Sequence, residues 1–353
     1  MKRTNARSIL SAGLVVAAVV AGTSAAAQAP AAVPRAAVVF SGPTMGTRYT
    51  VRVVMAGGDE AANDRVRAAI DRELSLANRL FSGWDSASEI SRLNAHASTE
   101  PFSVSAETLA ALELGRRTSE LTGGAFDVTV APLVEAWGFG PAKRPPAIPT
   151  AVTLAALHGR IDYRLLRLDA AGRTVSKARP DVACDLSALA GGWAADRVAE
   201  GLVALGHADV LVDVGGEVSA RGRRPDGSRW RVAVETPQPG KVGAVVELEN
   251  AAVATSGDYR NFWTDPQGRR RSHILDPRTG EPISHALASA TVVHHEGAWA
   301  DALATGLLVL GPDAGRALAA RERLAARLVL RQADGTYAEW STPAFDAVVV
   351  PPR

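Results

Sequence analysis

Apolar residues along the chain either alternate with polar ones or recur at helical spacing, and these two patterns predict most of its elements. Alternation predicts a strand over residues 48–55, whereas helical spacing predicts an amphipathic helix over residues 59–78. Residues 105–121 are predicted to form a second helix. It should end at Gly123 and Gly124, where glycine permits the backbone to leave the helix.

The remaining segments mix short strands, hairpins and helices. Ser86 and Glu89 have the spacing of a capping box, which predicts a short helix toward Asn94. Hairpin turns are expected at Asp226-Gly227 and Asp334-Gly335. Further strands are predicted over residues 165–168, 174–177, 181–186, 210–214, 217–221, 230–235, 244–248, 327–331 and 337–340. Further helices are predicted over residues 190–205, 298–310 and 313–320.

This order of elements predicts the fold class and the domain organisation. Because helices are interspersed with hairpins, we expect an α+β fold of layered mixed or antiparallel sheets with packed helices. The chain has 353 residues, 47% of them hydrophobic, which can supply the core of one domain or of two closely joined ones. We expect this domain over residues 44–345, with a proline-rich connector at residues 141–149 as the candidate subdomain hinge.

The N-terminus has the pattern of a secretory signal peptide over residues 1–29, with a basic start, an apolar stretch and small residues at its end. The apolar stretch is shorter than a membrane-spanning helix requires. A lipoprotein would need a cysteine at the cleavage point, but Cys184 is the only cysteine, and for the same reason no internal disulfide forms. We therefore expect a periplasmic protein without a stable membrane anchor, with residues 30–43 as a flexible leader.

The numbers of basic and acidic residues indicate which classes of partner the chain can bind. The chain has 39 basic and 37 acidic residues, and Lys2, Arg3 and Arg7 of the basic ones lie in the predicted signal peptide. The mature chain is thus close to neutral. It lacks the basic surplus that indicates nucleic-acid binding, so we expect no nucleic-acid partner.

Candidate chemistry is concentrated between residues 252 and 311, where small residues lie beside hydroxyls, carboxylates and an imidazole. Asp301 and Thr305 are four positions apart, so their oxygens should share one face of the helix predicted there. A carboxylate and a hydroxyl are hard ligands that suit Mg²⁺. The alternative is that Asp301 only stabilises the positive N-terminus of that helix.

An imidazole and a guanidinium precede this helix. His273 could accept a proton from an attacking hydroxyl, and Arg278 could hold a phosphate, although a structural histidine is equally consistent with the sequence. His294 and His295 are adjacent in a predicted strand and should point to opposite faces, so we do not expect them to form a metal site. Gly268 begins a basic run that is most simply a solvated hairpin tip.

Two glycine-rich segments could also approach a ligand. Gly124 precedes Asp127, whose carboxylate could bind a ribose or an amino group, although a helix end explains the glycine by itself. Gly215 and Gly216 form either a bulge or a ligand-facing turn.

Taken together, these motifs resemble the FAD:protein FMN transferase (ApbE-type) family. The resemblance covers residues 45–311, in the family's order, and includes the segments 123–129, 213–217, 255–259 and 273–280 with Asp301 and Thr305. It implies an exported α+β enzyme that binds FAD and Mg²⁺. Such an enzyme splits FAD, attaches FMN through a phosphoester to a Thr or Ser hydroxyl of a target protein, and releases AMP.

The resemblance also implies roles for individual residues. His273 matches the residue that activates the acceptor hydroxyl, and Asp301, Thr305 and the backbone carbonyl of Ala190 match the metal ligands. The residues expected to bind the flavin nucleotide are Met45, Phe81, Gly124, Phe126, Asp127, Asp185, Ser256, Gly257 and Arg278.

One departure from the family pattern keeps alternatives open. Gly191 occupies the position where the family usually has a lysine, so a cation expected near the phosphates is missing. An FAD pyrophosphatase that only forms FMN and AMP, or a non-catalytic periplasmic FAD-binding protein, are the alternatives to the transferase.

Overall fold

The computed structural model describes residues 36–57, 59–142, 144–238 and 240–351. The predicted signal peptide and the beginning of the predicted leader lie outside these ranges. The remainder of the leader is a strand: β1 (Ala36–Thr44) pairs along its whole length with β2 (Thr47–Met55), so the prediction of a flexible segment is wrong there. No helix within the described ranges is long and apolar enough to cross a membrane.

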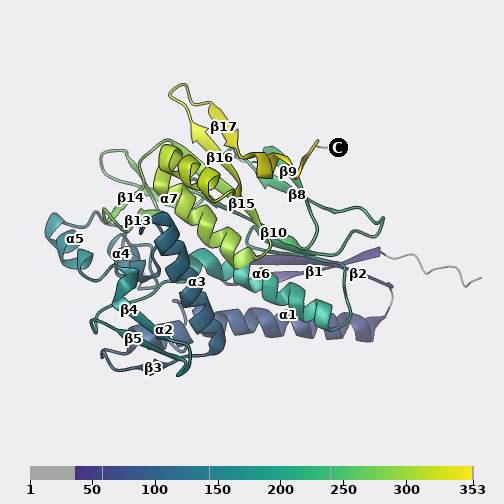
Figure 1. Cartoon of the computed structure of the whole chain (residues 1–353), viewed down its shortest axis with the longest axis horizontal. Helices are drawn as coiled ribbons and strands as arrows, with labels where there is room; N and C mark the ends of the chain where they lie inside the picture. The colour runs from purple at the N-terminus through teal and green to yellow at the C-terminus, as the bar shows by residue number, and fades with distance from the viewer. Residues whose placement is uncertain (1–35, 58, 143, 239, 352–353) are drawn as a thin grey trace, which may run out of the picture. The chain divides into compact units, whose positions relative to one another are not determined.

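An eight-stranded sheet forms the centre of the described body, and all of its neighbouring strands are antiparallel (Figure 1). Its order is β1-β2-β6-β7-β10-β15-β16-β17. Beyond β1 and β2 its strands are β6 (Val210–Val214), β7 (Glu217–Arg221), β10 (Ala251–Gly257), β15 (Leu287–His294), β16 (Ala325–Arg331) and β17 (Tyr337–Ser341). This sheet and its helices confirm the predicted α+β class.

Two tight hairpin turns lie at the same end of the sheet. Gly215 and Gly216 connect β6 to β7 with φ angles of 72° and 112°, so both adopt the backbone conformation that favours glycine. Met45 and Gly46 connect β1 to β2, also with positive φ. Because β2 pairs with β6, the two turns are neighbours.

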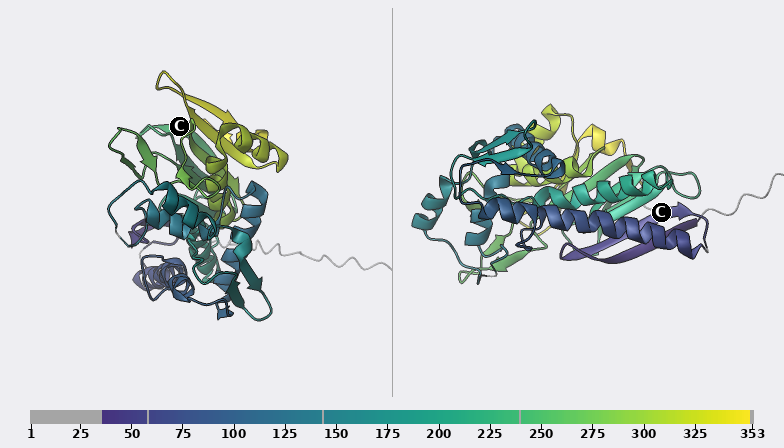
Figure 2. Two further views of the ribbon diagram at one scale, coloured as in Figure 1. Left: turned by 90° about the vertical axis from the view of Figure 1, so that its left-hand side faces the viewer. Right: turned by 90° about the horizontal axis from the view of Figure 1, so that it is seen from below.

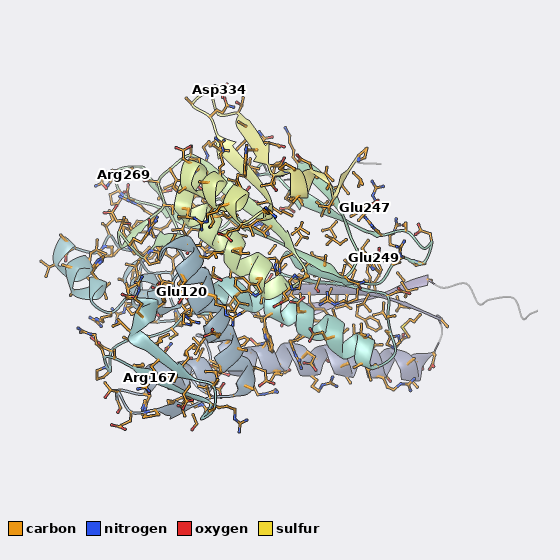
Figure 3. All side chains as sticks on the ribbon, in the orientation of Figure 1. Glu120, Arg167, Glu247, Glu249, Arg269 and Asp334 are labelled. Atoms are coloured by element: carbon orange, nitrogen blue, oxygen red, sulfur yellow. The ribbon has the colours of Figure 1, made fainter. Side chains whose placement is uncertain are left out.

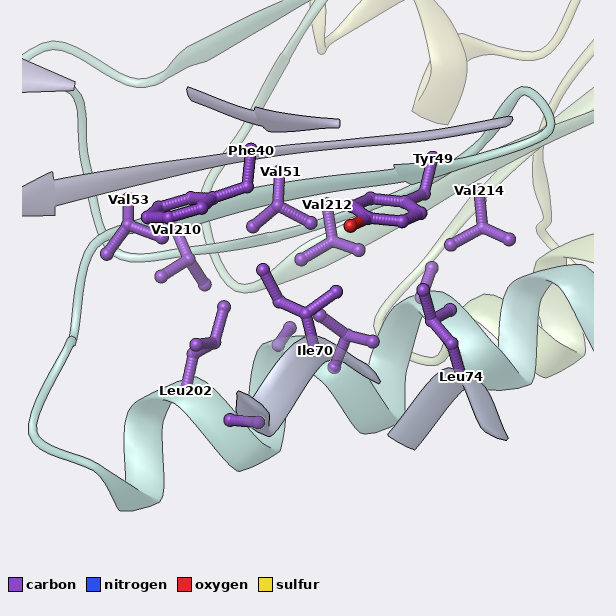
Figure 4. Close-up of a cluster of buried hydrophobic side chains, with 14 of the residues drawn as sticks. Phe40, Tyr49, Val51, Val53, Ile70, Leu74, Leu202, Val210, Val212 and Val214 are labelled. Carbon is purple, nitrogen blue, oxygen red and sulfur yellow. The ribbon is translucent and has the colours of Figure 1, made fainter. Parts of the chain in front are cut away.

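Three helices cover one face of this sheet: α1 (Glu60–Phe81), α6 (Ser187–Ala204) and α7 (Gly297–Arg321) (Figure 2). The alternation along the strands decides which side chains face them. Val51, Val210 and Val212 pack with Ile70 of α1 and Leu202 of α6 in a buried cluster (Figure 4). The predicted helix at residues 59–78 is confirmed as α1, although it continues three residues further.

A smaller sheet covers the opposite face, which gives three layers. It contains β18 (Val349–Val350), β9 (Val242–Leu248) and β8 (Trp230–Glu235), in that order. Val54 and Leu211 alternate with residues of the first cluster and pack here with Trp230, Val246 and Phe345. Phe345 belongs to α8 (Pro343–Asp346).

The segment between α1 and α6 forms a third part of the core, next to α7. Its elements are α2 (Glu89–Ala95), β3 (Phe102–Ser103), α3 (Ala106–Thr122), η1 (Val128–Val130), α4 (Ala131–Ala136), α5 (Ala151–His158), η2 (Tyr163–Leu165), β4 (Leu166–Asp169) and β5 (Thr174–Lys177). The predicted second helix is α3, and Gly123 ends it with a φ of 61°, as expected. Residues 141–149 contain no helix or strand where they are described, and the hinge stays a prediction.

Two short hairpins lie between β10 and β15, and the C-terminal helix agrees with the prediction. The hairpins are β11 (Phe262–Thr264) with β12 (Arg270–Ser272), and β13 (Leu275–Asp276) with β14 (Glu281–Pro282). The two predicted C-terminal helices are the halves of α7, which is kinked at Gly311, with φ of 80°, and Pro312. The predicted pairing across Asp334-Gly335 is confirmed by β16 and β17.

Three local predictions are wrong for identifiable reasons. Ser88 rather than Ser86 caps α2, because its hydroxyl accepts the Ser91 N–H, while Glu89 accepts hydrogen bonds from Ser105 instead. Residues 181–186 belong to no sheet. Asp226-Gly227 forms a turn, but it is not a hairpin turn, because the flanking strands β7 and β8 belong to different sheets.

Candidate functional site

A cavity of about 500 Å³ opens between the C-terminal end of β10, α7, β8 and the β6–β7 turn. Of the residues predicted to form the site, eight line it: Phe126, Asp127, Asp185, Ser256, Gly257, His273, Asp301 and Thr305. The structure therefore brings together groups that are up to 179 positions apart, from Phe126 to Thr305. A cavity of this size is typical of small-molecule and cofactor sites.

Asp301 and Thr305 lie on the face of α7 that borders the cavity. Asp301 is only 7% exposed, and its Oδ2 accepts the backbone N–H of Gly192 on α6 at 3.1 Å. Its other carboxylate oxygen has no hydrogen-bond partner in the described part of the chain. The hydroxyl of Thr305 contacts that of Ser256 on β10 at 2.8 Å. The prediction that these oxygens share one helix face is confirmed.

The close packing of α6 on α7 holds Asp301 in this position. A Cβ on Gly192 would lie 2.1 Å from the carbonyl oxygen of Gly297, so only glycine allows the two backbones to approach this closely. Asp196 of α6 accepts the backbone N–H of Gly297 and so satisfies the start of α7. Asp301 is not needed for that purpose, which argues against the alternative that it only stabilises the helix N-terminus.

A second carboxylate, that of Glu217, lies in the same cavity wall directly after the Gly215-Gly216 turn. Burial raises the pKa of Asp301 to about 7. Burial, and then repulsion by Asp301, raises the pKa of Glu217 well above its usual value. Among the described residues, no lysine or arginine forms an ion pair with either carboxylate.

This arrangement fits a hard divalent cation. Buried carboxylates without a cation are costly, and a bound cation would remove the repulsion between them. In the described ranges, no three histidine, cysteine or acidic side chains are grouped closely enough to hold a metal on their own. A cation at Asp301 must therefore take further ligands from the Thr305 hydroxyl, backbone carbonyls, water or a phosphate, as Mg²⁺ usually does.

His273 lies between β12 and β13 on the cavity wall. Its Nδ1 donates to the backbone carbonyl of Asn261 at 2.8 Å. Because a carbonyl can only accept, Nδ1 carries the proton and Nε2 has a free lone pair. Burial lowers the pKa of His273, which keeps the ring neutral. This is the state that a general base requires.

The hairpin that holds His273 is rich in ion pairs. The basic run predicted as a solvated tip is only partly so, because the buried Asp265 pairs with both Arg269 and Arg271. Arg269 itself lies at the periphery (Figure 3). Asp258 pairs with Arg270 and Arg331, which joins the hairpin to the central sheet.

The other five predicted residues do not line this cavity. Phe81 borders a neighbouring cavity of about 280 Å³ that also contacts Asp185, and its ring meets that of Trp193 edge-on at 4.8 Å. Met45 packs between two core clusters, and Ala190 is buried in α6. Gly124 and Arg278 are neighbours, with a Cβ on the glycine 3.9 Å from the arginine Cγ.

Two of the predicted ligand-binding side chains already have partners within the protein. Arg278 forms a two-point ion pair with Asp276, at 2.9 and 2.7 Å. Asp127 accepts hydrogen bonds from Thr129 and from the N–H of Tyr163, so both of its oxygens are used. These bonds hold the two side chains in place from within the protein.

His294 and His295 do not point to opposite faces. β15 ends at His294, so the chain turns and the two ring centroids lie 4.1 Å apart. His295 pairs with Glu296 at 2.9 Å.

Glu217 and Tyr259 also line the cavity, although neither was among the site residues predicted from the sequence. The sequence does contain a signal for Glu217, because acidic residues, Asp213 and Glu217, flank the Gly215-Gly216 turn on both sides. Tyr259 packs so closely on β10 that a Cβ on Gly257 would lie 2.4 Å from its Cε1. Gly257 is therefore required for the tyrosine ring to form this part of the cavity wall.

The fold and the cavity define an α+β enzyme whose site combines a neutral imidazole with carboxylate and hydroxyl oxygens suited to a cation. The model of the ApbE family matches residues 45–328, and the chain belongs to this family. Among its relatives, the FAD:protein FMN transferase of Vibrio cholerae is 40% identical over 314 residues, covering 88% of this chain and 92% of that protein. The FAD:protein FMN transferase of Klebsiella pneumoniae is 37% identical, covering 92% and 93%.

Solved structures agree with this assignment. The flavin transferase ApbE from Vibrio cholerae superposes with a TM-score of 0.81 at 39% identity, covering 89% of this chain and 100% of that one. The apo form of the Pseudomonas stutzeri flavinyl transferase ApbE also gives a TM-score of 0.81, at 38% identity, covering 89% and 97%.

Proposed function

We propose that this chain transfers FMN from FAD to a threonine or serine hydroxyl of a periplasmic or membrane target protein, with Mg²⁺, and releases AMP. The observation that supports this most is that His273 shares one cavity with Asp301, Thr305 and Ser256. A proton acceptor and a candidate cation site are thereby placed around one bound substrate. The curated relatives named above carry the same activity in their names.

The chemistry is a phosphoryl transfer. The acceptor hydroxyl oxygen forms a bond to the FMN phosphorus, and the bond from that phosphorus to the bridging oxygen of the pyrophosphate breaks. AMP leaves with the bridging oxygen, and the hydroxyl proton passes to Nε2 of His273. In such reactions positioning and charge neutralisation supply most of the rate enhancement.

Asp301 and Thr305 are the residues that would hold Mg²⁺, with a backbone carbonyl such as that of Ala190. When bound, the cation would neutralise charge on the pyrophosphate oxygens. The contact between Ser256 and Thr305 fixes the threonine hydroxyl on the cavity wall. The hydrogen bond from Gly192 fixes the Asp301 carboxylate in the same way.

The proposal is tested by incubating the purified mature chain with FAD, Mg²⁺ and a candidate acceptor protein prepared without flavin, and weighing the acceptor. We expect its mass to rise by one FMN phosphoester, not to rise with a chelator, and to rise about 10²- to 10⁴-fold more slowly with the His273→Ala variant. An unchanged acceptor beside accumulating FMN and AMP would instead identify an FAD pyrophosphatase.

A further inference from the structure

The absence of a side chain at Gly191 leaves room for the carboxylate of Glu217. Gly191 belongs to α6, and a Cβ there would lie 2.7 Å from Oε2 of Glu217. On the other side, a Cβ on Gly215 would lie 3.3 Å from the same oxygen. The Glu217 carboxylate thus occupies a slot that two glycines leave open.

This slot opens onto the cavity that Asp301 borders. Both carboxylates line the cavity, and adjacent residues of α6 contact them: Gly191 faces Glu217, and the Gly192 N–H donates to Asp301. Asp301 is buried and presents one oxygen without a hydrogen-bond partner among the described residues. No described lysine or arginine forms an ion pair with Glu217, and the nearby Arg260 is paired with Glu235.

We infer that Glu217 supplies a second negative charge to the divalent cation at Asp301, and that Gly191 sets the cation affinity of this chain by leaving room for that carboxylate. The inference rests on the proposed metal site. Two carboxylates attract a hard divalent cation more strongly than one, and inside a cavity their charges are screened less than in water. A side chain at position 191 would displace Glu217, and an ammonium there would neutralise it.

The test measures cation affinity without FAD and without turnover. Mn²⁺ is titrated into the full mature chain, and free Mn²⁺ is quantified by electron paramagnetic resonance. Asp301→Asn tests the metal site itself, whereas Glu217→Gln keeps the side-chain shape and removes only the charge. We expect Glu217→Gln to weaken Mn²⁺ binding about 10- to 100-fold, the range found when groups that support metal ligands are changed.

Two further variants test the role of Gly191. Gly191→Ala retains the Glu217 carboxylate but crowds it, so Mn²⁺ affinity should fall by less than in Glu217→Gln. Gly191→Lys places a cation beside Glu217 and should lower affinity at least as much as Glu217→Gln. The matched control is Glu249→Gln, because Glu249 pairs with Arg223 at 2.7 Å, lies outside the cavity wall and is peripheral (Figure 3).

The outcomes separate the inference from the function on which it rests. Loss of Mn²⁺ binding in Asp301→Asn together with unchanged affinity in Glu217→Gln overturns the inference and leaves the metal site intact. Unchanged affinity in Asp301→Asn overturns the metal site, and the inference with it. Circular dichroism confirms the fold of each variant before titration.

Discussion

The backbone N–H of Gly192 on α6 donates to Oδ2 of Asp301 on α7 at 3.1 Å. This bond exists because α6 and α7 meet at Gly192 and Gly297 with almost no space between their backbones. The position of a candidate metal ligand therefore depends directly on the packing of two helices. A change in that packing should therefore alter both the free energy of unfolding and the affinity for the cation.

Gly192→Ala is expected to destabilise the protein. Its Cβ would lie 2.1 Å from a backbone oxygen, which cannot move as a flexible side chain can. Overpacking of this kind costs about 1–3 kcal/mol, measured as a lower midpoint in urea unfolding. Gly191→Ala is the matched control, since its Cβ meets only the end of the Glu217 side chain and alanine favours the helix. Equal midpoints for the two variants would contradict this account of the helix contact.

Asp301→Asn should abolish metal-dependent turnover and the rise in melting temperature on adding Mg²⁺. Asp301 is only 7% exposed, so its carboxylate is a buried group. Without metal the variant should still be at least as stable as the wild type, because it loses a buried charge that faces Glu217. A wild-type Mg²⁺ response in the variant would place the metal site elsewhere.

The pH dependence of transfer should reflect a histidine that stays neutral in acid. Burial lowers the pKa of His273 below 6.5, so its Nε2 remains a proton acceptor until the pH falls below that value. The acidic limb of kcat/KM attributable to this group should therefore lie below pH 6.5. Its disappearance in His273→Ala, with a rate loss of about 10²- to 10⁴-fold and unchanged FAD affinity, would support the assignment. An unaltered rate in this variant would exclude His273 as the base.

The purified chain should bind FAD more tightly than FMN. FAD contains all of FMN and, in addition, an adenosine half that can bury further surface in the cavity of about 500 Å³. A difference of about tenfold in Kd, or about 1.4 kcal/mol, is expected from calorimetry. Equal affinities would show that the adenosine half makes no favourable contact.

The sequence predicted those parts of the fold in which one local pattern decides the structure. The alternation in β2 and the helical spacing in α1 and α3 were sufficient, because each element buries one face. Residues 181–186 show where a pattern misleads. Val182 and Cys184 are buried, as alternate residues of a strand would be. However, the Cys184 N–H donates to the Asn94 side-chain oxygen at 2.7 Å, and the Asn94 side-chain nitrogen donates to the Cys184 carbonyl at 2.8 Å. A side chain 90 positions away replaces a neighbouring strand.

In the candidate site, too, the sequence predicted only those positions that a local pattern decides. Asp301 and Thr305 share a helix face because of their spacing, which the sequence contains. Glu217 could not be assigned in this way, because its position depends on a glycine turn meeting a glycine of α6. The hydrogen bond from the Tyr163 N–H to Asp127 likewise joins residues 36 positions apart, which no local pattern encodes.

The most direct test of the account is the ratio of AMP released to flavin bound covalently to the acceptor, measured in one reaction with FAD and Mg²⁺. If the chain transfers FMN, the two amounts rise together in equal proportion, and both vanish in Asp301→Asn. AMP accompanied by free FMN, with no flavin on the acceptor, would contradict the transferase assignment.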